Sequence, residues 1–199
     1  MTLAELRAAF RSRADDTLEP FLWPDSEITL YLNEAQKEAC ERAHLIEAET
    51  TVALVPGTER YTLGKDVLAV LHARTPSRVL ARGEDRHRLR KDEFAETQRG
   101  TLWVRSPSVA ETLTLTVSRL PVSMAADADT PEIHQRYHYR LLDWVMRCAY
   151  LKQDTEAFDA KTATFHESLF ELSFGKRPDA NVQRKQREVR PFVVRYAGL

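Results

Sequence analysis

The chain has 199 residues, of which 43% are hydrophobic and 30% are charged, and its formal net charge is −1 at pH 7. This balance excludes a wholly disordered chain, and no apolar run approaches the roughly 20 residues that a membrane-spanning helix needs. The N-terminal stretch MTLAELRAAFRSRADD lacks the apolar segment of a signal peptide, so we expect no export and no membrane anchor.

Two amphipathic helices are expected first, over residues 2–15 and 25–45. Thr2 and Glu5 have the spacing of a capping box, in which each side chain accepts a hydrogen bond from the other residue's amide. The second helix has one apolar face, formed by Ile28, Tyr31, Leu32, Ala35 and Ala39. Between the helices, a connector with two prolines carries three large apolar residues that we expect to cover the core: Phe21, Leu22 and Trp23.

A β-rich section is expected over residues 49–121. Its short apolar or alternating runs have the length and the β-branched content of strands, over 51–55, 61–63, 67–71, 78–81, 101–104 and 113–120. Pro56 and Gly57 indicate a turn between the first two runs. Residues 83–91, GEDRHRLRK, are highly charged and are expected to form an exposed loop, followed by a short helix over 91–98.

Two long helices joined by a polar corner are expected over residues 131–152 and 155–174. Pro131 suits the first turn of the earlier helix, and Asp154 suits the N-cap of the later one. The earlier helix carries one apolar stripe, formed by Ile133, Tyr137, Leu141, Trp144, Val145, Cys148 and Leu151. The later helix is expected to continue this stripe with Phe158, Phe165, Leu169 and Leu172. Gly175 then suits a left-handed C-cap, and we expect most of the core to form against this hairpin.

The order of the elements predicts an α+β fold built on one core. We expect a helical bundle of two N-terminal helices and a C-terminal αα-hairpin, with a small inserted β-rich section and an extended C-terminal tail. Residues 1–175 would form the body, and residues 176–199 would form the extension.

The extension is basic, whereas the body is acidic. Residues 176–199 contain seven Lys or Arg and two acidic residues, hence a charge of +5, which leaves −6 for the first 175 residues. Such a tail predicts a partner, and three interpretations remain open: contact with nucleic-acid phosphates, a solvated face, or docking on an acidic protein surface. The alternation of Phe192, Val194 and Tyr196 favours docking, because it is typical of an added strand.

Motifs that would support catalysis are absent from the sequence. There is no glycine-rich phosphate loop and no nucleophile elbow, so we expect neither enzymatic activity nor a cofactor. His134 and His138 are four residues apart, but no glutamate follows the first and no third ligand is evident, so no metal site is predicted. His166 falls on the polar side of its helix and is expected at the surface. Cys40 and Cys148 are expected to be reduced core residues.

Two stretches carry a resemblance to a known family. The first is LWPDSEITLYLNEAQKEACERAHLI, over residues 22–46. The second is the predicted hairpin, with Pro131-Glu132-Ile133-His134, Leu141-Leu142-Asp143-Trp144, Ala149-Tyr150, Asp154, Phe170 and Phe174-Gly175. Together they resemble bacteriophage head–tail adaptor proteins and are similar to the tail tubular protein A group of short-tailed phages. The similarity covers most of residues 1–175, although residues 63–120 match only in being β-rich.

The resemblance implies a structural virion protein at the head–tail junction, made in the host bacterial cytoplasm. Such a protein forms a ring, usually of twelve copies, that docks beneath the portal protein. The ring extends the channel for double-stranded DNA, without sequence-specific binding, and is the platform for the nozzle or the next tail ring. The C-terminal extension would then contact the portal through Arg177, Arg184, Lys185, Arg187, Arg190, Phe192, Val194 and Tyr196.

Two other functions are compatible with the same residues. A nucleic-acid-binding regulator would use the basic tail to contact phosphates, and its affinity for duplex DNA would fall steeply with salt. A neck or head-completion protein of a long-tailed phage would belong to the same structural class as the adaptor.

Overall fold

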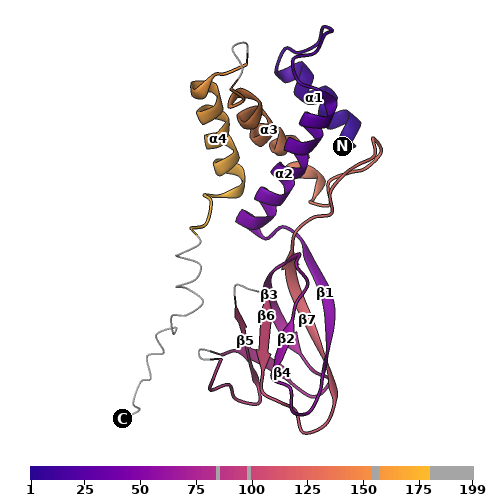
Figure 1. Cartoon of the computed structure of the whole chain (residues 1–199), viewed down its shortest axis with the longest axis vertical. Helices are drawn as coiled ribbons and strands as arrows, with labels where there is room; N and C mark the ends of the chain where they lie inside the picture. Colours follow the sequence, from indigo (N-terminus) through magenta and orange to yellow (C-terminus); the bar gives the residue numbers. More distant parts are fainter. Residues whose placement is uncertain (84–85, 98–99, 154–156, 180–199) are drawn as a thin grey trace. The chain divides into compact units, whose positions relative to one another are not determined.

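Two compact units make up the chain, and each has its own buried core. The computed structural model describes residues 1–83, 86–97, 100–153 and 157–179 (Figure 1). The helical unit comprises Met1–Ile46 and Arg119–Arg177. The sheet unit comprises Glu47–Ser118.

Among its described residues, the helical unit has four α-helices and one 3-10 helix. They are α1 (Leu3–Arg13), α2 (Asp25–Ala43), the 3-10 helix η1 (Gln135–Arg140), α3 (Leu141–Tyr150) and α4 (Ala160–Phe174). Helix α3 packs against both α2 and α4, and α1 packs against α2 and α3. The buried side chains at their centre are Leu6, Phe10, Ile28, Leu32, Leu142, Val145 and Phe170.

Local capping residues explain where these helices begin and end. Thr2 and Glu5 form a capping box: the Glu5 amide donates to the Thr2 hydroxyl, and the Thr2 amide donates to the Glu5 carboxylate. Helix α2 ends at Ala43 because His44 adopts a left-handed conformation with φ of 49°. The Asp159 carboxylate accepts from the amides of Lys161 and Thr162 at the start of α4.

Among its described residues, the sheet unit holds seven strands in the order β1-β7-β3-β4-β5-β6-β2, nearly closed into a barrel. They are β1 (Glu47–Leu54), β2 (Arg60–Thr62), β3 (Val67–Arg74), β4 (Val79–Arg82), β5 (Glu93–Thr97), β6 (Thr101–Val104) and β7 (Glu111–Arg119). The sheet is mixed, because β4 and β5 pair in parallel whereas β1 and β7 pair antiparallel. Its enclosed core includes Leu54, Val70, Leu80, Phe94, Leu102, Leu113 and Leu115.

The predicted fold, a helical bundle with a small β insertion on one core, is therefore wrong. Among its described residues, the structure has a mixed seven-stranded sheet nearly closed into a barrel and four α-helices, and it is 35% helical, with the 3-10 helix included, and 24% strand. The error has a physical cause: β1 pairs with β7, about sixty positions further along the chain, and local patterns do not reveal pairing at that distance. The helix expected over 91–98 is also wrong, since its centre forms β5, which pairs with β4 and β6.

The bounds of the C-terminal helices also differ from the prediction. The segment expected as one helix over 131–152 begins as the 3-10 helix η1 and becomes α-helical only at Leu141. The His134 side chain caps η1 by accepting from the Arg136 amide, so Pro131 lies outside the helix. The helix expected over 155–174 begins at Ala160, with Asp159 as its N-cap. Asp154, the predicted N-cap, lies outside the described residues. Two aspartates precede the same apolar run, and the sequence alone does not rank them.

Glu132 holds the segment that follows β7 by hydrogen bonds to Arg119 and Val122. Its carboxylate accepts hydrogen bonds from Arg119 at 2.9 and 3.0 Å and from the Val122 amide at 2.7 Å. The hydrogen bond with Arg119, aided by the amide, lowers the pKa of Glu132 against the opposing effect of burial.

Glu132→Gln is expected to lower the free energy of unfolding of the helical unit by about 1 kcal/mol at pH 7, since both side chains are partly exposed. A lowered folded-state pKa gives stability above the ordinary value near 4.5, and this stability is lost as the pH falls through the folded-state value. Urea melts of both proteins at pH 7 and below pH 4 test this. A deficit of the variant that persists unchanged in acid would contradict the assignment.

Candidate functional site

The predicted portal-contact residues lie almost entirely beyond the described part of the chain. Of the eight, the structure describes only Arg177, whose side chain is 69% exposed and whose Nε lies 3.2 Å from the Glu38 carboxylate. The other seven, from Arg184 to Tyr196, lie outside the described residues, so their role stays a prediction.

The structure does show how the extension begins. Arg42 is buried in the helical unit, where it pairs with Glu38 at 2.9 Å and donates to the Gly175 carbonyl at 3.1 Å. Its guanidinium also lies over the rings of Trp144 and Phe170, at 5.2 and 5.0 Å. Gly175, directly after α4, and Arg177 of the extension are thus both held by one buried ion pair on α2. Sequence reasoning missed it, although Glu and Arg at i and i+4 on a helix are a recognisable signal.

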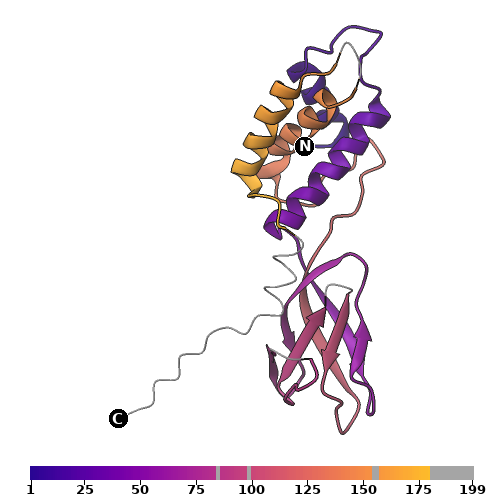
Figure 2. The ribbon, with the colours of Figure 1, turned by 60° about the vertical axis from the view of Figure 1, so that its left-hand side comes forward.

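Helix α4 presents an apolar stripe to solvent. Phe158, just before the helix, and Phe165 and Leu172 within it are 54%, 58% and 85% exposed, although we predicted that they line the core. The helix instead buries its other face, which consists of Ala163, His166, Phe170 and Phe174. This face is the buried one because the Phe170 ring packs against the rings of Trp144 and Phe174, with distances of 5.1 and 4.6 Å between ring centres. Figures 1 and 2 both show α4 at the side of the helical unit, where its outer face is open.

A buried polar cluster joins three helices beneath that stripe. The Asp143 carboxylate on α3 accepts from Arg13 of α1 at 2.6 Å and lies 3.2 Å from His166 Nδ1 of α4. His166 is 6% exposed, so its predicted position at the surface is wrong. A polar residue is expected at the surface, but His166 faces the buried Asp143 carboxylate of α3. The sequence alone does not show that these two side chains meet.

The other histidines have separate structural roles. His138 is buried. Its Nε2 forms a hydrogen bond with the Ile133 carbonyl at 2.9 Å, and its Nδ1 forms one with the Met1 amino group at 3.0 Å. His134 caps η1 instead of approaching His138. Among the described residues, no three His, Cys, Asp or Glu side chains gather as a metal site would require.

The two cysteines are both free. Burial raises the pKa of each thiol to about 12, so Cys40 and Cys148 remain protonated and unreactive at neutral pH.

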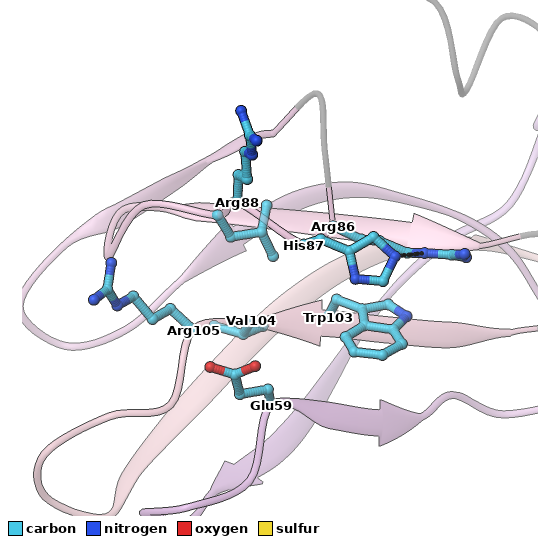
Figure 3. A pocket seen from close by; sticks show the side chains of 8 residues that line it. Glu59, Arg86, His87, Arg88, Trp103, Val104 and Arg105 are labelled. Atoms are coloured by element: carbon cyan, nitrogen blue, oxygen red, sulfur yellow. Dashed lines mark hydrogen bonds between the residues drawn. The ribbon is translucent and has the colours of Figure 1, made fainter.

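A basic pocket of about 320 Å³ lies in the sheet unit (Figure 3). It is lined by Glu59, Arg86, His87, Arg88, Leu89, Trp103, Val104 and Arg105. Trp103 comes from β6, directly opposite Arg60 of β2. Leu89 is buried against Gly83, where any side chain would collide with it, and the His87 ring lies 6.1 Å from the ring of Trp103 on β6. The charged stretch expected as a plain exposed loop therefore forms one wall of a pocket.

The sequence matches one protein family along most of its length. The match is to the family described as SU10 adaptor protein, over residues 1–195. The chain belongs to the SU10 adaptor protein family. The adaptor is therefore a structural phage protein and not an enzyme, and the predicted resemblance to head–tail adaptors is confirmed at the level of the family. No curated protein matches the sequence.

Membership in the family also bears on location and partners. It places the adaptor at the head–tail junction of a virion, in contact with portal and tail proteins. Within the described part of the chain, no helix combines the length and apolar character needed to cross a membrane. The narrower similarity to tail tubular protein A is not shown by the match and stays a prediction.

Proposed function

We propose that the adaptor forms a ring, of twelve copies, that docks beneath the portal and extends the DNA channel toward the tail. The face away from the portal would be the platform for the nozzle or the next tail ring. The observation that carries this proposal is the apolar stripe of Phe165 and Leu172 on α4 with Phe158 just before it, whose side chains are each more than half exposed.

The stripe supports contact between subunits. Phe165 and Leu172 are seven apart, so they lie on one side of α4 two turns from each other, and Phe158 lies seven residues earlier, just before the helix begins. Burying one such side chain contributes roughly 1.5–3 kcal/mol, which is a strong drive to cover it. In a closed ring each subunit uses two different patches, and an apolar helix face on one side of the unit suits one of them.

The basic extension supports attachment to the portal. Its charge of +5 on an otherwise acidic chain favours an acidic protein surface. In this proposal Arg184, Lys185 and Arg187 lie on that surface, while Phe192, Val194 and Tyr196 insert as apolar anchors. Many tails on one ring would add their effects, so each contact can be weak. Double-stranded DNA would pass through the channel without sequence-specific contacts.

The ring is expected to need the portal. Alone, the protein should be a monomer or a small oligomer in native mass spectrometry, and the complete ring should appear only with portal present. Leu172→Glu should abolish the ring without changing the melting temperature, because the side chain is already exposed. Leu18→Glu is the matched control, since Leu18 is 83% exposed in the same unit but belongs to the connector between α1 and α2.

Three results would contradict this proposal. A stable complete ring from the protein alone would show that portal is not needed. Normal rings from the Leu172→Glu variant would remove the stripe from the interface. Rings lost equally in both variants would show that added charge, and not the stripe, is responsible.

A further inference from the structure

The pocket of the sheet unit has a charge pattern that its surroundings lack. Four arginines elsewhere in this unit are close to carboxylates, namely Arg74, Arg78, Arg82 and Arg90, at 3.2, 2.6, 3.2 and 3.9 Å. Three arginines line the pocket, Arg86, Arg88 and Arg105, and Arg60 lies near its Trp103 ring. None of these four has a carboxylate of a described residue within 4.0 Å, although Arg86 Nε donates to His87 Nε2 at 3.0 Å. Guanidinium groups that gather at one concave site and face no described carboxylate favour an anionic ligand.

An aromatic ring lies among these arginines. Trp103 is half-buried, and the guanidinium groups of Arg60 and Arg86 each lie 6.0 Å from its ring centre. The His87 imidazole lies 6.1 Å away at an angle of 57°, so it does not cover the indole by parallel stacking. Figure 3 shows His87 over Trp103, whereas the side chains of Arg88 and Arg105 extend upward and to the left, away from the indole, at the rim of the pocket. Stacking surface and cationic groups in one site are the combination by which proteins hold single-stranded nucleic acid.

We propose that this pocket binds an unpaired nucleotide of single-stranded DNA, with its base against Trp103 and its flanking phosphates on the arginines. The inference goes beyond the proposed function, in which duplex DNA passes without being held, and it does not depend on ring formation. Duplex DNA keeps its bases stacked inside the helix and offers only phosphates. The pocket would therefore let duplex slide by and engage a strand only where a base is free.

The Glu59 carboxylate favours a nucleotide over an acidic peptide as the ligand of this pocket. Its carboxylate lines the same pocket and can only accept hydrogen bonds. A second carboxylate from a peptide would be repelled there, whereas a base can donate from a ring or exocyclic N–H group, as cytosine N4 does to Glu in known complexes. Glu59 also limits the number of phosphates that fit, so two or three contacts are expected.

The protein carries its own probe for this site. Of its three tryptophans, Trp23 and Trp144 are 2% and 3% exposed, so a ligand in the pocket should quench the fluorescence of Trp103 alone. A single strand of about 12 nucleotides, which is in the range of known single-strand sites, should quench it and bind the full-length protein. With about three phosphate contacts, the slope of log affinity against log salt should be about −2. The same strand annealed to its complement should bind at least about tenfold more weakly.

Two variants test the roles of the residues. Arg88→Glu should weaken binding of the single strand at least tenfold and make the salt slope shallower by about 1. Arg74→Glu makes the same charge change on the same unit away from the pocket, and it should leave the affinity nearly unchanged. Both arginines are exposed, and the Arg74–Glu49 pair is exposed too and so contributes little, so the melting curves of both variants should stay close to that of the wild type. Trp103→Leu should weaken binding at least about fivefold, by loss of base stacking.

Several outcomes would overturn the proposal. Equal affinity for duplex and single strand would show a simple phosphate-binding surface. Equal quenching by a Glu-rich peptide would assign the pocket to an acidic protein segment, and equal quenching by inorganic phosphate would reduce it to a site for any anion. Equal losses for Arg88→Glu and Arg74→Glu, or no binding of the strand at all, would also contradict it.

Discussion

Replacing Asp143 with alanine is expected to lower the free energy of unfolding of the helical unit by about 3–5 kcal/mol. The Asp143 carboxylate is almost fully buried, and it receives Arg13 at 2.6 Å and faces His166 Nδ1 at 3.2 Å. Removing it leaves a guanidinium and an imidazole in a site with few other partners, and three helices lose the group that joins them. The cost is that of an uncompensated buried charge, which exceeds the net value of the original pair.

Urea denaturation followed by circular dichroism measures this effect. Asp127→Ala is the control, because Asp127 also pairs with an arginine of α1, Arg7, but its side chain is 75% exposed. The control should cost no more than about 1 kcal/mol. Similar losses for both variants would show that the Asp143 cluster is not a special stabilising feature of the helical unit.

Replacing Trp144 with alanine is expected to cost about 3–5 kcal/mol in the same measurement. Its ring packs against Phe170 at 5.1 Å, and the guanidinium groups of Arg42 and Arg147 lie 5.2 and 4.5 Å from the ring centre. The loss combines a large cavity with two cations that lose their aromatic partner. Because Arg42 also holds the Gly175 carbonyl, the variant should further loosen the end of α4.

Leu172→Ala is the control for this change, since Leu172 lies on the exposed face of α4. It should leave the free energy of unfolding within about 0.5 kcal/mol of the wild type. Unchanged stability of Trp144→Ala combined with lost binding to a partner would instead assign Trp144 to a binding surface.

Local sequence signals predicted the features that depend on neighbouring residues. The capping box of Thr2 and Glu5 follows from spacing alone, and the structure contains it. Trp144 was expected on an apolar helix stripe, and it is buried. Each of these follows from residues a few positions apart, so no knowledge of the fold is needed.

Features that depend on distant contacts could not be predicted in this way. Helix α4 has apolar side chains on two faces, and periodicity alone does not tell which face packs against α3. The face with Phe165 and Leu172 was predicted to be buried, whereas the face with Phe170 is the one that packs against Trp144. His166 is buried only because Asp143 and Arg13 meet it from two other helices. The basic pocket forms where His87 of the 86–89 segment lies beside Trp103 of β6, and local pattern does not connect these residues.

The most direct test of the proposed function is attachment to purified phage heads. Heads that contain portal and heads that lack it are incubated with the protein, separated by sedimentation and assayed for bound protein. We predict saturable binding to portal-containing heads alone, at about twelve copies per head if the family stoichiometry applies. We also predict that deletion of residues 191–199 abolishes binding while the melting curve of residues 1–175 is unchanged. Equal binding to heads without portal, or full binding by the deletion variant, would contradict the proposed attachment to portal through the C-terminal extension.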